Sequence, residues 1–156
     1  MRFLLSVILF ALVCAPLAGA RVMPDRDLGP PGRDLAAGGS PLSLENGRGT
    51  ATVRSRDGSI VGAVRLGRVR AAYAQVSGCE TRRRLARRVV LCIGRDLTFW
   101  ATGRRWTITL RGAGINAAGR LKGSLTLQGT RGTYALDEDG EDERPWPRER
   151  RTLRIG

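Results

Sequence analysis

From residue 51 onward, apolar side chains recur at every second position of the chain. Between residues 106 and 111, Trp106, Ile108 and Leu110 alternate with polar residues. Comparable rows begin at Val53, Ile60, Val69, Val89, Leu97, Leu121 and Tyr134, and a last one at Leu153. A strand places successive side chains on opposite faces, so this alternation is typical of strands with one buried face and one wet face.

Turn-forming residues separate these rows. Asp57-Gly58 and Gly103-Arg104 each predict a hairpin turn, because these residue types tolerate positive φ. With turn signals about every 8 to 12 residues, the pattern predicts an all-β fold, a small antiparallel β-sandwich or barrel of about eight strands. Helical signal is confined to residues 82–90, where a turn or two could form, and to residues 114–119, a candidate helical crossover.

The N-terminal twenty residues have the layout of a secretory signal peptide. Arg2 precedes an apolar run over residues 3–13, and Ala18-Gly19-Ala20 forms a small-x-small cleavage site. The run is shorter than the about 20 residues of a transmembrane helix, and no transmembrane segment is expected after cleavage. We therefore expect a protein that is secreted, extracellular or held in the cell envelope. An uncleaved anchor and lipidation of Cys14 are the alternatives.

The remaining about 136 residues are enough for one domain. Residues 21–49 are rich in proline and glycine, carry few large apolar side chains, and predict a flexible leader. Leu42 and Leu44 could add a short edge strand to the sheet. A single β domain is expected over residues 50–156, with an acidic loop at residues 137–150.

The chain is strongly basic, with 27 Lys and Arg against 14 Asp and Glu. Residues 50–136 alone hold 17 basic and 3 acidic residues. Such an excess attracts polyanions, and more weakly as salt rises. Lys122 is the only lysine, so nearly all of the basic residues are arginine. This preference has two explanations, selection of the guanidinium fork for binding anions or the codon usage of a high-GC genome.

Two groups of arginines are candidates for polyanion binding. Five fall between the cysteines and two at the predicted hairpin tip: Arg82, Arg83, Arg84, Arg87, Arg88, Arg104 and Arg105. Outward residues of the predicted strands could line a sheet face as well: Arg54, Arg56, Arg68, Arg70 and Arg111. Anionic envelope polymers and lipid head groups are the expected partners, and a general solubilising charge is the alternative. With few aromatic residues for base stacking, no specific nucleic-acid recognition is predicted.

Cys79 and Cys92 are the pair left after removal of Cys14, so in an oxidising compartment they predict a disulfide. The chain contains no histidine, which excludes histidine-based triads and histidine-ligated metals. No nucleophile motif or phosphate-binding loop occurs. We therefore predict that the protein is not an enzyme. A hydrolase that uses paired carboxylates is the remaining catalytic alternative.

Residues 137–143 contain six carboxylates around Gly140. An EF-hand loop with this glycine at its sixth position would need ligands at Ala135 and Trp146, which cannot serve. A looser Ca²⁺ site could use Asp137, Asp139, Glu141 and Asp142. The alternative is a solvated loop lying against the basic body. No other cofactor is expected.

Residues 106–115, 119–129 and 132–134 share a glycine and alternating-leucine spacing, as in Gly119-Arg-Leu-Lys-Gly-Ser-Leu-Thr-Leu-Gln-Gly129. Over residues 95–136 the chain resembles small, uncharacterised exported all-β proteins of high-GC bacteria. The resemblance implies a β fold and transfers no functional residue. Taken together, the sequence predicts a secreted, non-catalytic β module of structural or interaction role. A small-ligand or Ca²⁺-binding domain is the alternative.

Overall fold

The computed structural model describes residues 39–137 and 142–156. The predicted signal peptide and most of the predicted leader lie outside these residues. Within them every element is a β-strand, which confirms the all-β prediction. The strands are β1 (Ser40–Ala72), β2 (Gln75–Ser77), β3 (Thr81–Ala86), β4 (Val89–Thr102), β5 (Thr107–Ala135), β6 (Arg144–Pro145) and β7 (Arg151–Ile155). In this part of the chain no helix is long and apolar enough to cross a membrane.

All seven strands belong to one antiparallel sheet. Their order is β2-β4-β1-β5-β6, with β3 also paired to β4 and β7 also paired to β5. Within the described residues, β2 and β3 at one end do not pair with β6 and β7 at the other, so the sheet is open rather than closed into a barrel.

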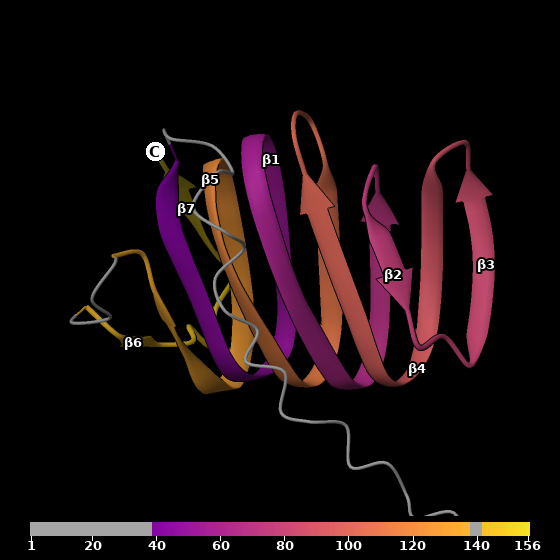
Figure 1. Cartoon of the computed structure of the whole chain (residues 1–156). Helices are drawn as coiled ribbons and strands as arrows, with labels where there is room; N and C mark the ends of the chain where they lie inside the picture. The colour runs from indigo at the N-terminus through magenta and orange to yellow at the C-terminus, as the bar shows by residue number, and fades with distance from the viewer. Residues whose placement is uncertain (1–38, 138–141) are drawn as a thin grey trace, which may run out of the picture.

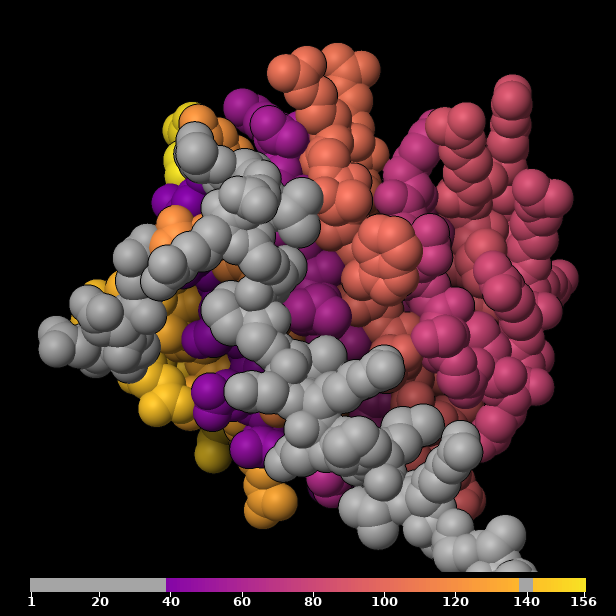
Figure 2. Space-filling view, viewed as in Figure 1, coloured from indigo at the N-terminus to yellow at the C-terminus, as the bar shows by residue number. Residues whose placement is uncertain are grey.

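The two long strands wind around each other. Leu121 of β5 pairs with Ser40 on one side and with Gly58 on the other, and both partners belong to β1. In the same way, Thr50 of β1 pairs with Arg111 and with Gln128 of β5. Each strand therefore passes the other twice, and the pair forms a coil with β3 and β6 toward opposite ends (Figure 1). On the surface, the purple early part of the chain lies beside the orange later part (Figure 2).

The coil turns a sharp corner at a row of aligned glycines. The glycine row runs across neighbouring strands in the order Gly94, Gly67, Gly112, Gly49 and Gly129. A Cβ atom on Gly67 would lie 2.1 Å from the carbonyl oxygen of Arg111, and one on Gly112 would lie 2.1 Å from that of Leu66. Because only glycine fits such an approach of two backbones, this row separates two broad faces of the sheet.

Most of the inward rows predicted from the alternation form the core. The row expected to begin at Val89 is wrong, because Cys92, which the disulfide joins to Cys79, takes the inward position and Ile93 is 42 % exposed. Ile108 and Leu110 are fully buried, as is Trp106 at the start of the same row. The indole Nε1 of Trp106 donates a hydrogen bond to the carbonyl oxygen of Gly58 at 3.1 Å, and the N–H of Ser55 donates to the carbonyl of Trp106 at 3.0 Å. β1 therefore bends around this buried indole near residues 55–58.

Both predicted hairpins are wrong, the first because of this bend and the second because of the strand order. Asp57 and Gly58 lie inside β1, where the register with β5 shifts between Ser55 and Asp57. Gly103 and Arg104 lie in the link between β4 and β5, which do not pair with each other but flank β1 on its two sides. Residues that favour turns tolerate positive φ. The same residues also suit a bulge or a corner, where the chain does not reverse its direction.

Other boundaries also differ from the predictions. The sheet begins at Ser40, so the domain boundary expected at residue 50 is ten residues too late, and both Leu42 and Leu44 are buried. Residues 82–90 and 114–119 are not helical, because they lie in the β3–β4 hairpin and in β5. The described residues form seven strands where about eight were expected, since several short rows merge into β1 and β5.

Candidate anion-binding face

One face of the sheet carries a row of threonines across four successive strand passages. Each member lies directly opposite the next in the register, in the order Thr109, Thr52, Thr126 and Thr152. The Oγ1 of Thr52 donates a hydrogen bond to that of Thr109 at 3.3 Å, and the hydroxyls of Thr126 and Thr152 are 3.0 Å apart. This threonine row forms the floor of a shallow hollow in which Arg70 and Arg150 also take part.

Arginines surround the threonine row. Arg70 extends the row beyond Thr109, and Arg68 lies directly opposite Arg111 on the neighbouring strand. On the other side of the row, Ser124 lies between Arg54 and Arg154. We call the exposed outward set the arginine face: Arg54, Arg68, Arg70, Arg111 and Arg154.

No described carboxylate neutralises the positive charge of the arginine face. Within residues 39–137 and 142–156, none of these five guanidinium groups makes an ion pair with a carboxylate. Glu80 lines a hollow beside Arg68 and Arg111, but its Oε1 accepts the backbone N–H of Arg95 at 3.2 Å. Like charges on opposing strand positions destabilise a sheet, so an anion bound between Arg68 and Arg111 would relieve their repulsion.

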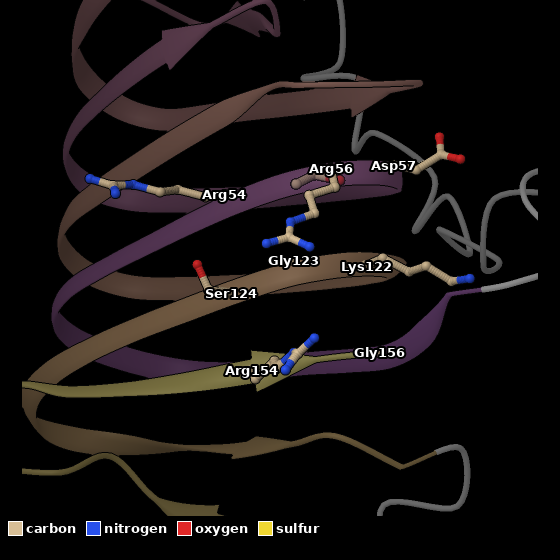
Figure 3. A pocket seen from close by; sticks show the side chains of 9 residues that line it. Arg54, Arg56, Asp57, Lys122, Gly123, Ser124, Arg154 and Gly156 are labelled. Atoms are coloured by element: carbon tan, nitrogen blue, oxygen red, sulfur yellow. The ribbon is translucent and has the colours of Figure 1, made fainter.

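A second basic hollow lies where β1, β5 and β7 meet. Gly123 has no side chain, and the Arg56 side chain lies over the bare ribbon there, with Arg54 and Arg154 on the flanking strands (Figure 3). Asp57 lies on the rim, where its Oδ1 accepts the N–H of Gly58 at 3.1 Å. The hollow shares Arg54 and Arg154 with the arginine face and therefore extends the same basic surface.

The seven arginines named from the sequence lie on two other parts of the sheet. Arg82, Arg83 and Arg84 belong to β3, Arg87 and Arg88 to the turn that follows, and Arg104 and Arg105 to the β4–β5 link. All seven are exposed. Arg83 lies opposite Leu91, next to the arginine face, and the Arg88 guanidinium stacks 5.4 Å from the ring centre of Tyr73. Their role in polyanion binding stays a prediction.

The sequence also indicated part of the arginine face itself. The expected outward residues Arg54, Arg68, Arg70 and Arg111 do lie on one face. Sequence reasoning missed Arg154 and the threonine row, because their neighbours come from distant parts of the chain. The disulfide prediction is confirmed, since Cys79 is bonded to Cys92 with a Cα–Cα distance of 5.3 Å.

The acidic segment is only partly described. The backbone N–H of Asp142 donates to Oδ2 of Asp137 at 2.8 Å, and the Asp142 carboxylate pairs with Arg144 at 3.4 Å. Asp139 and Glu141 lie outside the described residues. The part of the chain that the structure describes holds no group of three metal-ligating side chains, so the Ca²⁺ site stays an untested prediction.

The acidic loop predicted over residues 137–150 contains a buried anchor. Trp146 is 5 % exposed, and its ring lies against Gly47 and Gly129. Its indole Nε1 donates a hydrogen bond to the carbonyl oxygen of Thr133 at 3.0 Å. This tryptophan covers the end of the coil near β6.

No model of a known protein family matches the chain, and neither a curated protein nor a solved structure matches it. The function must therefore be inferred from the site alone.

Proposed function

We propose that this chain is a secreted, non-catalytic β module that uses its arginine face to hold anionic polymers or surfaces of the cell envelope. The observation that supports this most strongly is the set of five exposed guanidinium groups around the threonine row, none of which has a carboxylate partner among the described residues. A disulfide beside β3 and an all-β fold are compatible with a protein outside the cytoplasm.

The chemistry of this face suits phosphate, sulfate and carboxylate groups. A guanidinium group donates paired hydrogen bonds to the oxygens of such an anion, and charge assistance strengthens these bonds. Threonine hydroxyls donate to further oxygens of the ligand. Because the strands fix the Cα positions, little backbone entropy is lost when the ligand binds.

The face offers no obvious group for acid–base catalysis. The chain has no histidine, and the outward residues of the face itself are arginines, threonines and a serine. The two carboxylates at its border, Glu80 and Asp57, each accept a hydrogen bond from a backbone N–H. A general base must lie within hydrogen-bond reach of the proton that it removes, and neither a guanidinium nor an unactivated hydroxyl fills this role at neutral pH. This composition favours binding over catalysis.

The test compares two variants with the same loss of charge. One carries Arg68→Gln, Arg70→Gln and Arg111→Gln, and the control carries Arg87→Gln, Arg104→Gln and Arg105→Gln. On a heparin column developed with a salt gradient, we expect the first variant to elute at clearly lower salt than the control. Equal shifts for both variants would mean that net charge alone holds the polyanion, and would refute a specific face.

A further inference from the structure

Apolar side chains border the arginine face. On β4, Leu91 lies opposite Arg70 and Ile93 opposite Arg68. On the other side of β4, Arg83 lies opposite Leu91, so this leucine has an arginine on each side. The apolar residues are therefore interleaved with the basic ones.

Two hollows extend this apolar border. Leu85 of β3 lines one together with Leu91, Arg70 and Arg111. Leu66, directly beyond Gly67 of the glycine row, lines the next one together with Ile93. We call Leu66, Leu85, Leu91 and Ile93 the apolar strip.

The apolar strip is open to solvent. Leu66 is 59 % exposed, and Leu85 and Ile93 are each 42 % exposed. Single exposed leucines are ordinary on a protein surface, but a contiguous group beside unpaired arginines marks an interaction site. The nature of its partner follows from the combination of the two chemistries.

We infer that the arginine face, together with the apolar strip, docks on the surface of an anionic lipid bilayer. This inference rests on the proposed function and names the partner of the same site. The leucines and the isoleucine would enter the boundary between head groups and acyl chains, while Arg68, Arg70 and Arg111 reach the lipid phosphates. A soluble polyanion would occupy the guanidinium groups but leave the apolar strip in water.

The charges argue against a second copy of the chain as the occupant. In a two-fold dimer the same patch meets itself, so Arg68, Arg70 and Arg83 of one copy would lie near those of the other. Burial of like charges without counterions is costly. An anionic bilayer satisfies the arginines and the apolar strip at once.

The experiment measures how the full chain partitions into vesicles. One set of vesicles contains equal parts of phosphatidylglycerol and phosphatidylcholine, and the other contains phosphatidylcholine alone. The test variant carries Leu85→Ser and Ile93→Ser. The matched control is Trp100→Ser, which removes a larger side chain that is 48 % exposed and lies on β4 beyond Gly94, at the far side of the glycine row.

We expect the unaltered chain and the Trp100→Ser control to bind the anionic vesicles alike and to prefer them over phosphatidylcholine. For the variant that carries Leu85→Ser and Ile93→Ser, the partition coefficient into anionic vesicles should fall by about tenfold or more, because two apolar side chains can no longer be buried in the bilayer. The apolar N-terminal segment is the same in all variants. Binding that persists unchanged in the double variant would therefore come from elsewhere and would overturn the inference.

Heparin retention separates this inference from the proposed function. The double serine variant should elute from heparin as the unaltered chain does. Suppose that the double serine variant binds both vesicles and heparin normally, while the arginine variant is no longer retained on heparin. The partner is then a polymer, and the lipid inference is wrong. If sedimentation shows that the unaltered chain dimerises and the double serine variant does not, a second copy covers the apolar strip and the inference is also wrong.

Discussion

Replacement of Gly112 by alanine tests whether the glycine row sets the shape of the coil. Gly112 has φ of +150°, and a Cβ atom there would lie 2.1 Å from the carbonyl oxygen of Leu66 and 2.8 Å from the Cα of Gly67. Forcing a side chain into a packed site costs about 1–3 kcal/mol. A backbone conformation that L residues rarely adopt adds about 1–2 kcal/mol. We therefore expect the free energy of unfolding to fall by about 2–5 kcal/mol.

Two other glycines separate these two contributions. Gly67 has no positive φ, yet its Cβ would lie 2.1 Å from the carbonyl oxygen of Arg111, so Gly67→Ala reports the contact alone. Gly103 has φ of +87° and nothing within 4 Å of an added Cβ, so Gly103→Ala reports the backbone strain alone. We expect the loss to be largest for Gly112→Ala, smaller for Gly67→Ala and about 1 kcal/mol for Gly103→Ala.

Urea unfolding with the disulfide intact, followed by circular dichroism, measures all three variants on one scale. The slope of the free energy against urea should stay the same, because the variants expose the same surface on unfolding. If Gly112→Ala and Gly67→Ala cost no more than Gly103→Ala, the close approach of the backbones does not constrain the coil and the reasoning is refuted.

Three further predictions concern the ends of the coil and the threonine row. Replacing both Cys79 and Cys92 by alanine should lower the free energy of unfolding by about 2–4 kcal/mol. β3 should then open first, visible as lost hydrogen-exchange protection at residues 81–86, and unchanged protection there would contradict the prediction. Trp146→Ala should cost about 3–5 kcal/mol in urea unfolding, since it removes a buried ring over Gly47 and Gly129, and a loss near zero would show that the ring does not cover the core. Thr52→Val with Thr126→Val should lower the salt needed to elute the protein from heparin while leaving stability within about 1 kcal/mol, and unchanged elution would remove the hydroxyls from the site.

Alternation in the sequence predicts the inward residues of most strands, as Ile108 and Leu110 show, but it fails on β4, where Ile93 faces solvent and Cys92 the core. It carries no information on which strands are neighbours, so the winding of β1 and β5 was not predicted. A second regularity does carry it: Gly49 and Gly67 are 18 residues apart, as are Gly94 and Gly112. Ser40 and Gly58 both pair with Leu121, so one circuit of the coil takes the 18 residues from 40 to 58. Glycines at this spacing therefore mark the same corner on successive circuits.

The candidate site was only partly predictable for the same reason. Arg54, Arg68, Arg70 and Arg111 each show their outward parity in the local sequence. The threonine row joins residues 52, 109, 126 and 152, which no local pattern connects. Asp57-Gly58 misled because its preference for unusual backbone angles fits a bend inside a strand as well as a hairpin.

The winding of β1 against β5 has a consequence for how the chain acquires its structure. β1 is complete at residue 72, but its partners begin only at residues 89 and 107. Until those later residues emerge, β1, the longest of the described strands, has exposed edges and nothing to pair with. Assembly is therefore delayed by sequence separation, which makes it slow and leaves the nascent protein open to aggregation. A holding chaperone that keeps residues 40–72 apart from other chains would be expected to raise the yield of native protein.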